Sequence, residues 1–234
     1  MQSIEWTDNI KHLGAGAFSE CESLLTVDIP SSVTHIGNYT FYGCDNLTYV
    51  KIPNSVTALG GYTFFGCKSL TSINIPNSIM SVDESTFRCC DSLADEDGFV
   101  IINKVLYAYC PYIRKRKEID IPNGVIAIAA GAFCCSFKIE TVTVPASVKT
   151  IGYGAFGSCE KLTTVYISDG VTEIGDAVFY NCNCLKELHI PDSVKQIGAE
   201  LYKFLGNNHP IYAPKGSYAE QYANANAIPF VVET

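Results

Sequence analysis

The sequence has little charge, few cations and no long apolar run. Charged residues make up 17% of the 234 residues, and 24 acidic against 16 basic side chains give a formal net charge of −8. Phosphate backbones are bound by Lys and Arg, so we expect no nucleic acid partner. No apolar run approaches the roughly 18 residues of a membrane helix, so we also expect no membrane insertion.

Proline recurs in register and reveals an internal repeat of 23 residues. Seven prolines keep this spacing or a multiple of it: Pro30, Pro53, Pro76, Pro122, Pro145, Pro191 and Pro214. With Pro as position zero, Val or Ile fills position 3, Ile, Leu or Val position 6, Phe or Tyr position 11, and Leu or Ile position 17. A single unit has too little apolar surface to fold alone, so we expect stacked coils in which each column packs against itself.

Each unit predicts two short strands and a turn. One strand precedes the proline, as in Leu47–Ile52, and one follows it, as in Ser32–Gly37, because both are rich in β-branched residues and bounded by Pro or Gly. The segment ending in Ala-Phe-x-x-Cys, as in Gly152–Cys159, predicts a helical or 3-10 turn. We expect a glycine after the second strand to supply a turn conformation closed to β-branched residues. These glycines are Gly37, Gly60, Gly152, Gly175 and Gly198.

The repeated pattern IP-x-x-V-x-x-I-G-x-x-A-F-x-x-C-x-x-L-x-x-I-x-IP closely resembles the BspA-like leucine-rich repeat. Ser147–Ile167 matches it almost residue for residue, with a small departure at Val144, where the pattern has Ile. The resemblance implies a repeat solenoid of the leucine-rich repeat type, mainly β with short helical or 3-10 turns. It implies a right-handed superhelical stack of about nine coils.

We expect this solenoid to cover residues 1–216, with one irregular coil at about 94–118. There the columns break, and Phe99–Ile102 and Val105–Tyr109 read as a β-hairpin around a two-residue Asn103-Lys104 turn.

Residues 217–234 are expected to form a C-terminal cap, because a solenoid end needs a lid over its last apolar layer. Ser217 is a helix N-cap candidate for Tyr218–Ala225, and Ile228–Val232 reads as a closing strand.

The chain starts within a repeat. The first unit begins at Ile4, places Trp6 in an Ile column, and has no signal-peptide n-region or h-region before it. We therefore expect a piece of a longer protein, which would also explain the missing signal.

Six of the eleven cysteines share position 14. They are Cys21, Cys44, Cys67, Cys90, Cys159 and Cys182. Equivalent Cβ atoms in stacked coils are about 4.8 Å apart, beyond the roughly 3.5–4.5 Å of a disulfide, which favours reduced, buried thiols. No C-x-x-C spacing occurs, so we expect no metal and no cofactor. Oxidation stays open for the off-column cysteines Cys89, Cys110, Cys134, Cys135 and Cys184.

No catalytic constellation is present in the sequence. Nucleophile elbow, phosphate loop and zincin helix are all missing, and the scattered carboxylates suggest no acid–base pair. His12 and His35 share a position in adjacent units, and we interpret them as exposed strand residues rather than metal ligands. The basic run 114–117 is interpreted as a solvated loop. We therefore predict that the protein is not an enzyme.

Outward-facing positions remain as candidates for function. The residues two and four positions before each proline are expected to face outward and to form a polar strip that includes Tyr. The turns carry further aromatic residues. The candidate protein-binding residues are Asp28, Tyr49, Lys51, Asn74, Asp120, Tyr166 and His189 on the strands, and Tyr39, Tyr42, Tyr62 and Phe65 on the turns. A solvated sheet face with no partner is the open alternative.

The resemblance implies a non-enzymatic protein–protein or host-surface interaction module, part of a larger cell-surface or secreted protein with a role in adhesion. The partner would be a protein or host-surface ligand. Two alternatives stay open: an intracellular scaffold, which the missing signal allows, and a thiol- or metal-dependent protein.

Overall fold

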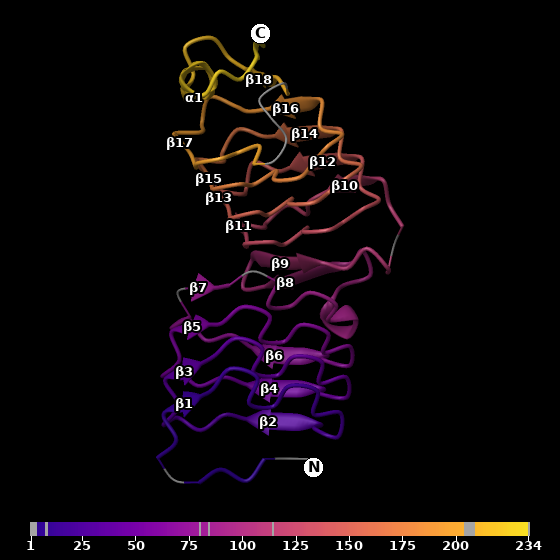
Figure 1. The fold of residues 1–234 in the computed structure, drawn as a ribbon, viewed down its shortest axis with the longest axis vertical. Helices are drawn as coiled ribbons and strands as arrows, with labels where there is room; N and C mark the ends of the chain where they lie inside the picture. Colours follow the sequence, from indigo (N-terminus) through magenta and orange to yellow (C-terminus); the bar gives the residue numbers. More distant parts are fainter. Residues whose placement is uncertain are drawn as a thin grey trace. The chain divides into compact units, whose positions relative to one another are not determined.

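The computed structural model describes residues 4–7, 9–79, 81–83, 85–113, 115–203 and 209–233. The chain forms two compact units. Unit 1 comprises Met1–Asn103 and Tyr107–Arg114, and unit 2 comprises Lys104–Leu106 and Lys115–Thr234. Both are β-solenoids (Figure 1). Together their described residues form about nine turns and one short α-helix. The predicted solenoid is thereby confirmed.

Unit 1 has two parallel sheets, and each full coil contributes one strand to each. The first sheet has the order β2 (Thr26–Asp28), β4 (Tyr49–Lys51), β6 (Ser72–Asn74). The second has the order β1 (His12–Leu13), β3 (His35–Ile36), β5 (Ala58–Leu59), β7 (Ser81–Val82). Paired residues such as Val27 and Val50 differ by one 23-residue repeat. Figure 1 shows these strands as successive rungs.

The irregular coil contains the predicted hairpin. A 3-10 helix, η1 (Asp91–Leu93), is followed by β8 (Phe99–Ile102) and β9 (Val105–Tyr109), which are sheet neighbours. Asn103 and Lys104 between them have φ values of 51° and 66°. Positive φ at both central residues is the requirement of a type I′ hairpin turn. The basic run that follows lies partly outside the described residues, because position 114 is not among them.

Unit 2 repeats the two-sheet plan. One sheet has the order β10 (Glu118–Asp120), β12 (Thr141–Val144), β14 (Thr164–Ile167), β16 (Glu187–His189), β18 (Ile211–Ala213), β19 (Phe230–Val232). The other contains β11 (Ala127–Ile128), β13 (Thr150–Ile151), β15 (Glu173–Ile174) and β17 (Gln196–Ile197). Within this unit, the start of β9 pairs with β11, Val105 opposite Ala127.

Phenylalanine at position 11 forms the centre of each core. In unit 1 the rings of Phe41 and Phe64 stack at 5.5 Å with an interplanar angle of 1°. In unit 2 Phe156 stacks on Phe133 at 4.9 Å and on Phe179 at 5.5 Å. All of these rings are 0% exposed. Like residues therefore pack on like residues in successive coils, as the repeat predicts.

The Ala-Phe-x-x-Cys segment is a chain of tight turns. In 152–159, Gly157 N–H bonds to Gly154 C=O at 2.8 Å, whereas Phe156 N–H bonds to Val178 C=O of the next coil at 3.0 Å. The i→i+3 bonds are of the 3-10 type, but alternate amides turn to the neighbouring coil, so no continuous helix forms.

The glycine after the second strand has a different role from the one predicted. None of the five has a left-handed φ. Instead, a Cβ on Gly152 would lie 2.7 Å from the amide N of Ala130, and one on Gly37 would lie 2.9 Å from the amide N of Ala15. The turn-conformation prediction is wrong for these residues: glycine is required because the backbones of adjacent coils approach each other closely at this position.

Five of the six position-14 thiols, those of Cys44, Cys67, Cys90, Cys159 and Cys182, donate a hydrogen bond to the preceding coil. Cys44 Sγ lies 3.0 Å from the Phe18 carbonyl, and Cys182 Sγ lies 2.9 Å from that of Phe156. Burial raises the pKa of Cys44 to about 11 and raises that of Cys67 further. All eleven cysteines are described, and no disulfide joins any of them. The thiols therefore act as protonated core donors.

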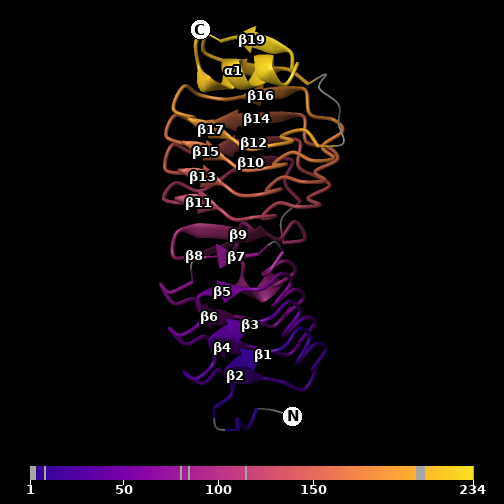
Figure 2. The same ribbon diagram turned by 60° about the vertical axis from the view of Figure 1, so that its left-hand side comes forward.

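The end of unit 2 is covered by α1 (Tyr218–Ala225) and β19 (Figure 2). Ser217 Oγ accepts a bond from Glu220 N–H at 3.2 Å, and the Glu220 carboxylate accepts one from Gly216 N–H. This reciprocal capping fixes where the helix begins. The helix has the predicted range, whereas β19 begins two residues later than the predicted strand. The 216/217 domain boundary stays a prediction.

Phe156→Ala should lower the free energy of unfolding by about 3–5 kcal/mol, because the ring is fully buried between two others. Denaturant unfolding of both proteins measures the change. Tyr153→Ala is the control, since that side chain is 47% exposed and should shift the midpoint little. An unchanged midpoint for Phe156→Ala would contradict the stacked column.

Gly152→Ala should destabilise the protein by about 1–3 kcal/mol, because the new methyl group meets the backbone of the preceding coil. Gly14 occupies the same repeat position, but a Cβ there has nothing within 4 Å. Gly14→Ala should therefore be nearly neutral. Equal losses in thermal unfolding would show that backbone approach is not the reason for this glycine.

Six thiols should resist modification in the folded protein at pH 8, because they are buried: Cys44, Cys67, Cys90, Cys110, Cys159 and Cys182. Burial raises the pKa of Cys44 and Cys67, which lowers the thiolate fraction that reacts. Titration with an aromatic disulfide reagent should give at most five fast thiols and eleven after denaturation. A native titre of eleven would disprove the buried arrangement.

Candidate functional site

The predicted strand residues of unit 1 share one outward strip. Asp28 lies opposite Lys51, and Lys51 lies opposite Asn74, in register across β2, β4 and β6. Tyr49 is on the same face and is 38% exposed. Lys51 Nζ is 3.2 Å from the Asp28 carboxylate, an exposed pair that contributes little to stability.

Asn74 has a structural role within this strip. Its side-chain oxygen accepts a bond from Ile52 N–H at 2.8 Å, and its amide donates to Ile52 C=O at 3.0 Å. Both polar atoms of the side chain are thus bonded to the neighbouring coil. Asn74 therefore has less hydrogen-bonding capacity left for a ligand than its outward position in the sequence suggests.

The strip of unit 2 carries an aromatic column. Asp120, Tyr166 and His189 occupy equivalent positions on β10, β14 and β16, with Thr143 between the first two. The His189 ring stacks on Tyr166 at 4.5 Å and on Tyr212 at 4.9 Å. The sequence analysis missed Tyr212, although its place two residues before Pro214 is the signal that finds it.

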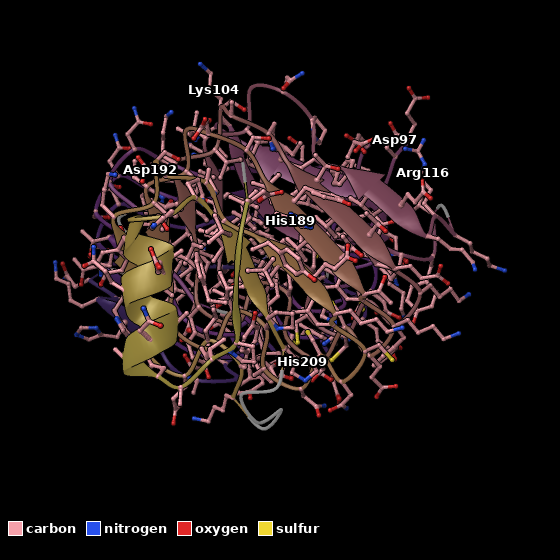
Figure 3. The ribbon with its side chains drawn as sticks, turned by 90° about the horizontal axis from the view of Figure 1, so that it is seen from above. Asp97, Lys104, Arg116, His189, Asp192 and His209 are labelled. Atoms are coloured by element: carbon pink, nitrogen blue, oxygen red, sulfur yellow. The ribbon has the colours of Figure 1, made fainter. Side chains whose placement is uncertain are left out.

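His189 is also held by carboxylates. Nδ1 lies 2.9 Å from Glu233 Oε1, and Nε2 lies 3.8 Å from Glu187 Oε2. Nε2 is buried and makes no hydrogen bond within the described residues. Figure 3 looks onto this end of unit 2 and labels His189, which lies over the strands.

A hollow of about 370 Å³ opens beside this column. Three of its lining residues are acidic, and none is Lys or Arg. It is lined by Tyr166, Ile167, Asp169, His189, Ile190, Pro191, Asp192, Pro214 and Glu233. Lys149 and Lys195 lie nearby and bond to the backbone carbonyls of Gly170 and Asp192. The hollow itself therefore has an acidic and aromatic lining.

The turns of unit 1 bring together the four predicted aromatics. Tyr39 stacks on Tyr62 at 5.2 Å, and Tyr42 stacks on Phe65 at 5.3 Å. Within each coil the rings also touch, Tyr39 with Tyr42 at 5.9 Å and Tyr62 with Phe65 at 5.7 Å. The Arg88 guanidinium lies 5.9 Å from the Phe65 ring centre. We call Tyr39, Tyr42, Tyr62 and Phe65 the turn cluster.

Two residues of the turn cluster occupy a strained backbone position. Position 9 of the repeat is left-handed in both units. Gly fills it at Gly16, Gly131 and Gly154, and non-glycine residues fill it at Ser85, Ala177 and Glu200. Tyr39 and Tyr62 occupy it with φ values of 59° and 58°. A left-handed non-glycine residue costs about 1–2 kcal/mol.

His12 and His35 lie side by side on paired strands, with ring centres 6.0 Å apart. In the part of the chain that the structure describes, no group of three or more His, Cys, Asp and Glu is arranged to hold a metal ion. Next to His12, at the first coil of unit 1, is a hollow of about 780 Å³ lined by apolar residues such as Trp6 and Phe18.

Among the described residues, no helix has the length and apolar character to cross a membrane.

Three solved structures resemble this chain. A leucine rich cell surface protein from Faecalibacterium prausnitzii A2-165 is 26% identical, with 99% of this chain and 73% of that chain covered and a TM-score of 0.52. A leucine-rich repeat protein from Eubacterium ventriosum ATCC 27560 is 22% identical over 92% of this chain and 67% of that one, with a TM-score of 0.54. The pneumococcal vaccine antigen PcpA is 15% identical over 96% and 85%, with a TM-score of 0.50. The last two likenesses concern the fold alone.

No curated protein matches the chain. The sequence pattern of the BspA type Leucine rich repeat region matches residues 1–114 and 96–209, with 6 copies. Together with the stacked coils described above, this match shows that the chain belongs to the BspA-type leucine-rich repeat family.

Proposed function

We propose that this chain is a non-enzymatic protein-interaction module of a cell-surface or secreted protein. The buried columns hold nearly the same residue in every coil, whereas the outward positions vary, which is the division of labour expected of a repeat scaffold that presents a binding surface. A similar solved structure is named a cell surface protein, which supports the proposed location.

The main support for this proposal comes from Tyr39 and Tyr62 of the turn cluster. Folding does not require Tyr at position 9, since other coils have Gly, Ser, Ala or Glu there in the same left-handed conformation. Tyr39 nevertheless exposes 44% of its surface from this position. Rigid, exposed aromatic side chains are frequent binding anchors, and Tyr is not needed here for the fold. We infer that the turn cluster contacts a partner protein.

The aromatic column of unit 2 extends the proposed binding surface. Its rings cover each other's faces, so the central His189 has no open face on which a sugar ring could stack. The carboxylates of Asp169, Asp192 and Glu233 instead give the hollow the charge that suits a basic side chain. We therefore expect the partner to place Arg or Lys here, with binding that weakens as salt increases.

Replacing both strained tyrosines, Tyr39→Gly/Tyr62→Gly, should weaken partner binding at least about 10-fold, because two anchors are removed. Stability should change little, since the lost ring contacts are offset by a relaxed backbone. The partner is first captured from membrane and secreted protein fractions with the immobilised chain, and its affinity is then measured by interferometry beside thermal unfolding.

Tyr112→Ala is the matched control, because this tyrosine is 73% exposed and lies outside the turn cluster. Charge reversal at Lys51 and at Asp120 tests the strip of each unit separately. Binding that survives all of these variants would refute the proposed surfaces. A large loss of stability in the double variant would show that the tyrosines are structural.

A further inference from the structure

Two adjacent cysteines of unit 2 lie outside the core columns. Cys134 and Cys135 occupy positions 12 and 13, and both are half-buried, whereas the core position of this coil holds Ser136. Their sulfur atoms are 3.5 Å apart. Cys134 Sγ thus lies against a second sulfur atom, whereas position-14 cysteines such as Cys159 donate to a Phe carbonyl.

The next coils hold Cys134 in place through Tyr180. The Tyr180 hydroxyl lies 3.2 Å from Cys134 Sγ, although the residues are 46 apart in sequence. Gly154 and Gly157 leave room for this ring, because a Cβ on Gly157 would overlap it and one on Gly154 would lie 2.9 Å from Cε1. The hydroxyl is thus within hydrogen-bonding distance of the sulfur atom and fixes its position.

Geometry disfavours a disulfide between these two residues. Adjacent Cα atoms across a trans peptide are about 3.8 Å apart, below the roughly 4.4–6.8 Å that disulfides span. A shared ion fits better. Two thiolate bonds of about 2.3 Å to one centre, with sulfur atoms 3.5 Å apart, subtend an angle of about 100°, which is close to tetrahedral or pyramidal geometry.

We propose that Cys134 and Cys135 form a two-thiol chelate for a thiophilic metal or metalloid centre, with Tyr180 as a positioning residue. Soft thiolate ligands select soft centres. Two protein ligands leave the other coordination positions of the centre to water or to an added thiol. A trivalent, three-coordinate centre suits the site because only one such position then remains. This inference is independent of the protein-binding surfaces proposed above.

A monosubstituted trivalent arsenical, p-aminophenylarsine oxide, is the probe. The arsenic atom forms one bond to each sulfur and loses its oxygen, which leaves as water with the two thiol protons. Arsenic stays trivalent, so no oxidant or reductant is needed. Titration of the folded chain should give one adduct by intact mass and remove two titratable thiols.

Cys134→Ser and Cys135→Ser should each weaken arsenical binding on the order of 100-fold, because the second bond of a chelate forms at a high effective concentration. Tyr180→Phe, which keeps the ring and removes the hydroxyl, should weaken it several-fold without lowering the thiol titre. Melting temperatures of the three variants check that each folds.

Cys89→Ser is the matched control. Cys89 and Cys90 are also adjacent, but Cys90 Sγ is buried and bonds to the Phe64 carbonyl at 3.0 Å, so this pair should not chelate. Protection of Cys134 and Cys135 from alkylation in the unmodified chain gives a readout that needs no variant. The proposal is overturned if no adduct forms, if Cys134→Ser retains full affinity, or if Cys89→Ser loses it.

Discussion

The fold depends on one constraint, the contact of each repeat position with the same position in the adjacent coil. Phe41 lies against Phe64 and Phe156 against Phe179 because 23 residues return the chain to the same place one strand spacing away. Strand pairing, ring stacking and the thiol–carbonyl bonds all keep this register. A coil that gained or lost one residue would misplace all three sets of contacts together.

The same constraint separates positions that can vary from positions that cannot. Inward positions contact two neighbouring coils and are limited in size, whereas outward positions contact solvent and each other. Exposed pairs such as Asp28 and Lys51 contribute little to stability. The outward strip and the turns can therefore change residue without loss of the fold, which is how one scaffold comes to present Tyr, His, Asp and Lys at equivalent places.

Much of the fold follows from the sequence because the signal is repeated. The strands, the hairpin at Asn103-Lys104 and the helix after Ser217 all come from local patterns with a clear physical cause. The reason why Gly152 must be glycine does not follow from a local pattern. A Cβ there would clash with backbone 22 residues away, and the sequence of a single repeat cannot reveal this contact. The candidate surface could be predicted from the repeat positions that face outward. The stacking of Tyr212 on His189 and the structural role of Asn74 could not, because both depend on which side chains meet across coils.

Because each regular coil makes its strand and core contacts with its neighbours, a whole 23-residue repeat is the natural step of change in this protein. The residues from Pro145 to Ile167 meet their equivalents on both sides, so their removal would bring two matching surfaces together. In the gene, such a step is an in-frame duplication or deletion of 69 bases, three for each of 23 residues. Unequal recombination between repeats can therefore lengthen or shorten the recognition surface while the protein stays folded.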